Sequence, residues 1–329
     1  MRKVQAWCVA PAFILLMCMA LPARAAVEGR FERTLTVSGA VSLSVTSGSG
    51  GIDVGTGPDG AVHVAGVIRA NTWNATVSSD EIARAVKELE ARPPIVQQGN
   101  TIRIGEIEDE RIARLVAISY TVAVPRNTSV TSKTGSGSQS IAALAGGVTA
   151  SSGSGALTVG AIEGPVEVRT GSGSIRVEGA RGGIFSSSGS GSIKLGTVAG
   201  DARIRTGSGS IDLQQIVSNA ADVSSGSGHI RVADLKGGIK ASTASASIEI
   251  AGTPTTAWHA TTSSGSITLA IPADTSFRLQ AHTNSGSIHT DHTLKVTTTG
   301  GHELEGTTGD GSVLVEARSS SGSITVRRR

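Results

Sequence analysis

The residues of this chain best suited to chemistry are two histidines and an aspartate near the C-terminus. His289, Asp291 and His292 are close in sequence, and on a strand the side chains of the first two would share a face. Imidazole and carboxylate groups bind zinc and similar metals. The spacing is not one of the strong metal-binding patterns, however, and exposed turns often carry these residue types. We therefore expect these residues to be solvated surface, and we expect no metal and no cofactor. If a metal does bind, His289, Asp291 and His292 are the candidate ligands.

Signals for catalysis are weak in the rest of the chain. Gly55 to Gly60 has the spelling Gly-x-Gly-x-x-Gly, but residues 61–64 read as a strand and not as the helix start that binds a pyrophosphate. The Gly-x-Ser-x-Gly elbow of serine hydrolases does not occur. The carboxylates alternate with bases instead of forming an isolated acid pair, and aromatic residues for a sugar platform are few. We expect no catalytic residues and no enzyme activity.

A Gly-Ser segment followed by an aliphatic residue recurs along the chain, and this repeat determines where the other residues lie in the fold. A fixed period of this length indicates stacked repeats, none of which can bury its own apolar face. The aliphatic residue returns at intervals of 18, 18, 18, 19, 18, 19 and 21 residues, at Leu157, Ile175, Ile193, Ile211, Ile230, Ile248, Ile267 and Ile288. One place after it, the charge alternates in sign from Lys194 to Glu249. Opposite charges on neighbouring strands stabilise their pairing, which favours stacking of coil on coil.

Each repeat contains two short strands separated by the Gly-Ser turn. In residues 166–170 and again in residues 174–178, apolar and polar side chains alternate, as in a strand with one buried face. The sequence therefore predicts an all-β, single-stranded β-solenoid, a parallel β-helix with about 18 residues per coil. Right-handed coils are expected, because parallel crossovers are right-handed. Ile175, Ile193, Ile211, Ile230 and Ile248 are expected to form one buried column.

One segment interrupts the strands and predicts a single inserted α-helix. Ser78 and Glu81 have capping-box spacing, apolar residues between 82 and 89 fall on one helical face, and Pro93 ends the pattern. We expect the helix near residues 79–91. The predicted organisation is a signal peptide over 1–25, an N-terminal β part over 26–130 that holds the helix, and regular solenoid repeats over 131–329.

The first residues have the features of a secretory signal peptide. Arg2 and Lys3 precede a short apolar stretch, and Ala23 to Ala25 fit the small-x-small cleavage pattern. Cleavage near Ala25 would remove both cysteines and three basic residues, leaving 26 basic against 26 acidic residues. Neutral overall charge gives no indication of nucleic-acid binding, and the apolar stretch is too short for a membrane span. We expect the protein to be exported, either to the periplasm or out of the cell and onto the cell surface.

The strand Ser119 to Pro125, which ends in Val-Pro, and the Ser-Gly-Ser-Gly-Ser-Ile repeats from Thr134 onward resemble the DUF4097 family of bacterial β-strand-repeat proteins. Members are often labelled as adhesins, and the resemblance brings no catalytic or metal-binding residues. Together with the signal peptide and the absence of catalytic signals, it predicts a secreted, non-enzymatic solenoid that acts as an adhesive or structural surface in the cell envelope, with an envelope protein or surface glycan as its partner. A periplasmic protein-binding scaffold or sensor, and a carbohydrate-active β-helix enzyme, remain the alternatives.

Overall fold

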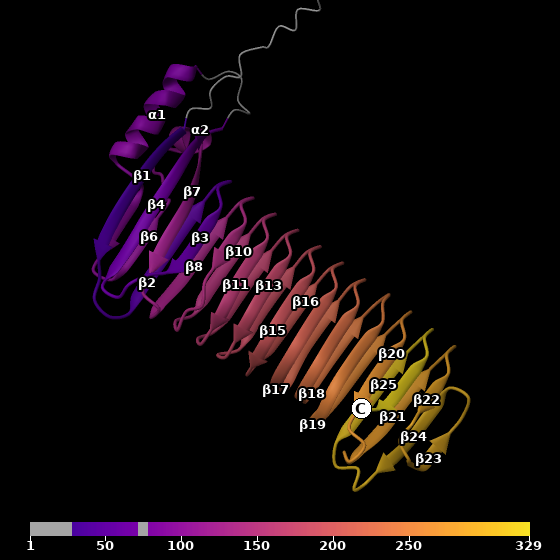
Figure 1. Cartoon of the computed structure of the whole chain (residues 1–329). Helices are drawn as coiled ribbons and strands as arrows, with labels where there is room; N and C mark the ends of the chain where they lie inside the picture. Colours follow the sequence, from indigo (N-terminus) through magenta and orange to yellow (C-terminus); the bar gives the residue numbers. More distant parts are fainter. Residues whose placement is uncertain (1–27, 72–77) are drawn as a thin grey trace, which may run out of the picture.

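Coils of two strands stack into a rod, with helices at one end and antiparallel strands at the other (Figure 1). The structure is a computed structural model that describes residues 28–71 and 78–329. The expected signal peptide lies outside the described residues. Neither of the helices in the described part has the length and apolar character needed to cross a bilayer.

The strands form two facing sheets. Sheet I holds the strands that lead into each Gly-Ser turn, and sheet II holds those that follow it, while three long strands, β17 (Ile211–Ser225), β18 (Ile230–Thr243) and β19 (Ile248–Thr262), run through both. In spatial order, sheet I contains β5 (Ile95–Gln98), β6 (Thr101–Ile104), β2 (Val41–Ser47), β8 (Thr128–Thr134), β10 (Val148–Ser152), β12 (Val166–Thr170), β14 (Ile184–Ser188), β16 (Ala202–Thr206), β17, β18, β19, β25 (Leu314–Ser319), β21 (Phe277–Thr283), β24 (Glu303–Thr308) and β23 (Lys295–Thr299). Sheet II contains β1 (Glu28–Thr36), β4 (Ala61–Ala70), β7 (Val116–Val124), β3 (Ile52–Thr56), β9 (Gln139–Ile141), β11 (Leu157–Ile162), β13 (Ile175–Ala180), β15 (Ile193–Ala199), β17, β18, β19, β20 (Ile267–Ile271), β26 (Ile324–Arg328) and β22 (Ile288–Thr290).

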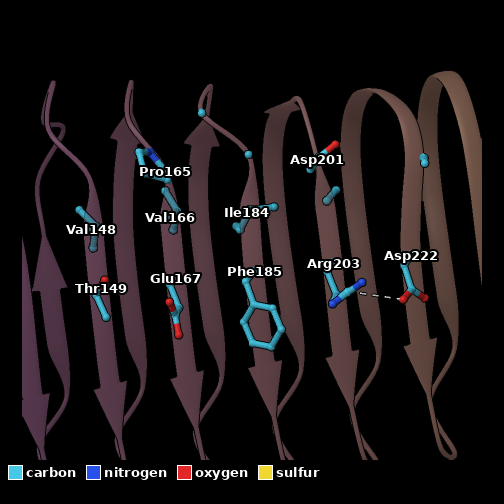
Figure 2. Close-up of a pocket in the computed structure, with 14 residues that line it drawn as sticks. Val148, Thr149, Pro165, Val166, Glu167, Ile184, Phe185, Asp201, Arg203 and Asp222 are labelled. Carbon is cyan, nitrogen blue, oxygen red and sulfur yellow. Dashed lines mark ion pairs between the residues drawn. The ribbon is translucent and has the colours of Figure 1, made fainter.

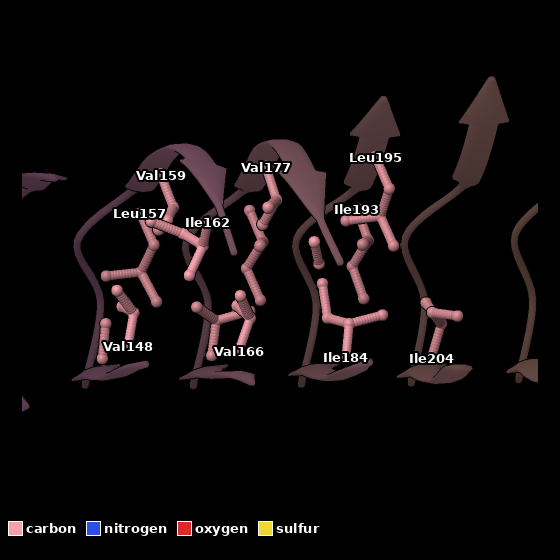
Figure 3. Close-up of a cluster of buried hydrophobic side chains, with 14 of the residues drawn as sticks. Val148, Leu157, Val159, Ile162, Val166, Val177, Ile184, Ile193, Leu195 and Ile204 are labelled. Carbon is pink, nitrogen blue, oxygen red and sulfur yellow. The ribbon is translucent and has the colours of Figure 1, made fainter. Parts of the chain in front are cut away.

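The predicted all-β solenoid and its buried aliphatic column are confirmed. Neighbouring coils pair in parallel, with Ile175 opposite Ile193 and Ile193 opposite Ile211, and the column continues through Ile230 and Ile248. These five side chains are at most 1% exposed. They pack between the two sheets with the aliphatic residues of sheet I (Figure 3). The handedness of the coils and the division of the chain near residue 130 stay predictions.

The Gly-Ser turns hold neighbouring coils together through buried hydroxyls. Thr170 accepts a hydrogen bond from the backbone N of Gly173, in its own turn, at 3.1 Å and donates to the carbonyl of Gly155, in the preceding coil, at 3.2 Å. Ser188 repeats this arrangement one coil later. A Cβ on Gly173 would lie 2.0 Å from the oxygen of Gly155, so the turn needs glycine for the close approach of two backbones. A left-handed backbone is not the reason, because the φ of Gly173 is not positive.

Two helices, and not one, interrupt the strands of the described part. The predicted helix is α1 (Ser79–Ala91), and its cap, Ser78, accepts from the backbone N of Glu81. The second helix, α2 (Glu110–Leu115), was missed, so the expectation of one inserted helix was wrong. Asp109 caps it by accepting from the backbone of Arg111 at 2.8 Å. Its six residues are too few to show a helical period, although an Asp before a short amphipathic run is a helix-start signal.

The last coil in the sequence lies inside the stack and not at its end. β25 lies between β19 and β21, and β26 lies between β20 and β22. Ile324 therefore lies between Ile267 and Ile288, so these two residues are not neighbours in the stack although they are consecutive in the repeat. One edge of β21 pairs with β24. The other edge, which faces the middle of the rod, pairs with β25 of the C-terminal coil. Stacking in sequence order thus ends at β20 instead of continuing to residue 329.

The first coil in the sequence is also placed inside the stack. β2 lies between β6 and β8, and β3 lies between β7 and β9. Beyond this coil the added strands turn antiparallel, with β5 on β6 and with β4 and β1 extending sheet II from β7. The rod therefore has a parallel middle and an antiparallel extension at each end.

Candidate binding surface

The outer face of sheet I carries a row of side chains from five neighbouring strands. In register across β10, β12, β14, β16 and β17, this row reads Thr149, Glu167, Phe185, Arg203 and Asp222. Strand alternation places them there, because the residues on either side of each one point into the core. Phe185 is the one partly exposed ring among the Phe, Tyr and Trp residues of the described part, since Phe31, Tyr120, Trp258 and Phe277 are buried.

A hollow of about 560 Å³ runs along this row where the strands begin (Figure 2). Small residues at the corners leave the space open, namely Gly182, Gly183, Ala202 and Ala220, and Pro165 and Asp201 complete the rim. We call this hollow the Phe185 groove. It is wide and shallow, so it is suited to contact with an extended partner and not to the enclosure of a small molecule.

The charges around the Phe185 groove cancel one another. Arg169 pairs with Glu167 at 2.7 Å, and Arg203 and Arg205 share Asp222 at 3.7 and 3.0 Å. The guanidinium of Arg169 also lies over the Phe185 ring, with its carbon 4.1 Å from the ring centroid. The pairs are exposed and each contributes little to stability. The groove therefore presents hydrogen-bonding groups and one aromatic ring without net attraction for a charged ligand.

The structure does not bring the three candidate metal ligands together. Nε2 of His289 lies 3.1 Å from Oδ1 of Asp291, and both side chains are exposed. His292 is buried at 6% exposure, edge-on to Phe277 with 5.1 Å between ring centroids. Within residues 28–71 and 78–329, no three His, Cys, Asp or Glu side chains are grouped as a metal site would require. The absence of a metal stays a prediction.

Burial of His292 predicts a loss of stability in mild acid. Burial, with the nearby charge of Arg328, lowers the pKa of His292 below its ordinary 6.5, and the side-chain Nε2 has no hydrogen-bond partner among the described residues. The folded state favours the neutral imidazole of His292. This preference contributes fully to the free energy of unfolding above about pH 6.5, and the contribution is lost as the pH falls from there toward the pKa of His292 in the folded protein. The free energy of unfolding should decline by up to about 1.4 kcal/mol per pH unit in that window.

Denaturant titrations between pH 7 and pH 5 measure this effect. His292→Leu should flatten the decline, whereas His289→Leu, which removes an exposed ring from the same segment, should keep the wild-type slope. A wild-type stability that stays level across this window would contradict the prediction.

A second cluster on the same face of sheet I was missed by sequence reasoning. Nδ1 of His259 lies 2.6 Å from Oε2 of Glu316, and Arg318 pairs with the other oxygen of that carboxylate at 2.5 Å. Burial alone would raise the pKa of Glu316, but the hydrogen bond with His259 and the charge of Arg318 lower it below its ordinary value. Glu316 and Arg318 lie on the same strand, but only the placement of β25 beside β19 brings His259 to them, so no local motif could have revealed the cluster. A carboxylate held ionised between two partners acts as a structural link between coils.

The comparisons with known proteins identify a family. The family model described as Toastrack DUF4097 matches residues 67–327. No curated protein matches the chain. The chain is similar to a solved "putative adhesin" from Parabacteroides distasonis, with 9% identity over 91% of this chain and 97% of that chain and a TM-score of 0.42. It is also similar to a "putative adhesin" from Parabacteroides merdae, with 11% identity over 92% and 96% of the two chains and a TM-score of 0.40.

A third solved structure is a "putative lipid binding protein" from Parabacteroides distasonis, with 12% identity over 92% of this chain and 97% of that chain and a TM-score of 0.38. The family match covers every coil from β7 to the C-terminal one, and it includes the Val-Pro strand and the Gly-Ser repeats that carried the resemblance. The chain belongs to the Toastrack DUF4097 family.

Proposed function

We propose that the protein is a secreted, non-enzymatic adhesive surface of the cell envelope, and that it contacts its partner through the Phe185 groove. The observation that carries this proposal is the position of Phe185. It is the only partly exposed ring among the Phe, Tyr and Trp residues of the described part, and it lies in a hollow of about 560 Å³. Aromatic and arginine side chains are the residues that most often anchor a contact surface.

The chemistry of the groove favours an uncharged surface glycan as the partner. A sugar ring presents an apolar face, which can stack on Phe185, and hydroxyls, which can bond to Glu167, Asp201 and Arg203 at the rim. The Arg169 guanidinium over the ring is exposed. Displacing it costs about 0.5–1 kcal/mol, the value of a cation–π contact at an exposed site. The ring is therefore available to a ligand.

Export to the envelope is supported by the sequence of residues 1–25. A basic start, an apolar stretch and a small-x-small site are the features of a signal peptide. The chain that would remain has no cysteine, so it has no thiol to be oxidised outside the cytoplasm. Periplasm and cell surface are both compatible with these features.

Binding to native envelope material tests the proposal. The purified protein should sediment with envelope fragments, and Phe185→Ala should raise the apparent Kd about tenfold, which corresponds to about 1.4 kcal/mol for the lost ring contact. Arg176→Ala, an exposed change on β13 of sheet II, is the matched control and should bind as the wild type does. Equal binding by wild type and Phe185→Ala would show that the groove is not the contact.

Chemical treatment of the envelope separates the alternatives. Periodate oxidation of the fragments should abolish binding if the partner is a glycan, and protease treatment should leave it intact. The reverse result would favour the protein-binding scaffold. Release of new reducing ends from the polysaccharide during incubation would contradict a non-enzymatic role.

A further inference from the structure

The two ends of the rod are stepped in opposite senses. At the end that carries the helices, sheet II extends three strands beyond the first coil, through β7 and β4 to β1, while sheet I extends two, through β6 to β5. At the other end, sheet I extends three strands beyond the C-terminal coil, through β21 and β24 to β23, while sheet II extends only one, β22. Sheet I is therefore one strand shorter than sheet II at the first end and two strands longer at the second, so the two steps have opposite senses although they differ by one strand in size. The end strands β1, β22 and β23 can be followed in Figure 1.

The overhanging edge of sheet II is protected from other chains. α1 lies along the beginning of β1, where Glu90 accepts from the backbone N of Arg30 at 2.9 Å and the carbonyl of Ala91 accepts from the side chain of Arg33. β1 also carries four charged residues in nine. Charges and a covering helix are the usual means by which proteins block unwanted pairing at a sheet edge.

The two outermost strands of sheet I lack such protection. β5 is uncharged and β23 carries a single charge, Lys295. No described strand pairs with their outer edges. Val96 on β5 and Val296 on β23 are 43% and 53% exposed. In the described part, the only other large hydrophobic side chain this exposed is Val217, in the middle of the rod. α1 does not cover β5, because β5 lies at the opposite end of β1, where Gln97 donates to the carbonyl of Thr36.

The strand directions allow these two edges to pair. β5 is antiparallel to β6 and therefore runs against the strands of sheet I. β24 is antiparallel to β21, and β23 is antiparallel to β24, so β23 runs with those strands. β23 of one molecule placed beside β5 of another would form an antiparallel pair. This is the pairing that both strands already make within the molecule.

We infer that the protein assembles head to tail with further copies of itself, with β23 of one copy added to β5 of the next. The partner is a second copy because the unprotected edges lie at opposite ends of one sheet, have compatible directions and belong to steps of opposite sense. The contact is heterologous, so it propagates into filaments unless its rotation closes a ring. The inference does not depend on the Phe185 groove, which lies in the middle of the rod on β10 to β17.

The test uses lysine at each edge, the residue that most effectively blocks edge pairing. Light scattering with size exclusion should show that the mass of the wild-type protein rises with its concentration, and electron microscopy should show extended rods. Val96→Lys and Val296→Lys should each remain monomeric, with unchanged circular dichroism. Val217→Lys, a matched change at an exposed valine away from both ends, should assemble as the wild type does.

Mixing the two edge variants identifies which surfaces meet. Val96→Lys keeps an intact β23, and Val296→Lys keeps an intact β5, so an equimolar mixture should form species of twice the monomer mass and nothing larger. A wild-type protein that stays monomeric at all concentrations would overturn the inference. Assembly that persists in both lysine variants, or a mixture that forms no dimer, would overturn it as well.

Discussion

Replacing Ile211 with aspartate is expected to destabilise the protein by about 4 kcal/mol or more, because a carboxylate would be buried without a partner. Ile211 is 1% exposed and pairs with Ile193 on one side and Ile230 on the other. Both neighbours are apolar, so the new charge has nothing to bond with. The change should lower the denaturant midpoint sharply or prevent folding.

The matched control lies on the same strand. Val217→Asp places the same charge at a valine that is 46% exposed, so its effect on the free energy of unfolding should stay within about 0.5 kcal/mol. Circular dichroism during urea titration measures both variants. Similar midpoints for Ile211→Asp and the wild type would contradict the continuous buried column.

Replacing Trp258 with alanine should destabilise the protein by about 4 kcal/mol, the usual cost of removing a large aromatic ring from a core. Trp258 is fully buried, lies opposite Ile239 on one side and Val315 on the other, and donates from its ring nitrogen to the carbonyl of Gly237 at 2.9 Å. The variant loses the packed ring and leaves that carbonyl without its partner.

A phenylalanine at the same position separates the two losses. Trp258→Phe keeps most of the apolar volume and loses the hydrogen bond, so it should cost about 1–3 kcal/mol. Urea titrations of the three proteins compare these values. Equal stability of the alanine and phenylalanine variants would show that the ring volume contributes nothing, which would contradict close packing at the junction of β19 and β25.

The repeat units could be predicted from the sequence because each is encoded locally. Alternation around Ile175 and Ile193 defines two strands and the inward face, and Ser78 with Glu81 defines the start of α1. The order of the coils could not be predicted. Ser-Gly-Ser precedes both Ile288 and Ile324, so either coil fits on Ile267, and the choice depends on which edges of the folded stack remain free.

The Phe185 groove could not be predicted for a related reason. In the sequence, Phe185 is one outward position of one strand, no different in spacing from Arg203. The groove arises from small residues, such as Gly182 and Ala220, that lie in different coils and meet only after stacking. The sequence also contains no sign that His292 is buried and His289 exposed, because the burial of His292 depends on its contact with Phe277.

The interior position of the C-terminal coil has a consequence for the order in which the chain is made. During synthesis β21 and β22 are made before β25 and β26, and at that moment Ile288 can stack directly on Ile267, since the repeat sequence is the same. The strands that natively follow β19 and β20 in the stack, β25 and β26, are made later. Folding during synthesis should therefore include a late exchange of strand partners, visible as slow hydrogen-exchange protection of β21 and β22 in newly made chains. A newly made molecule reaches its native stack only after β25 and β26 have been synthesised.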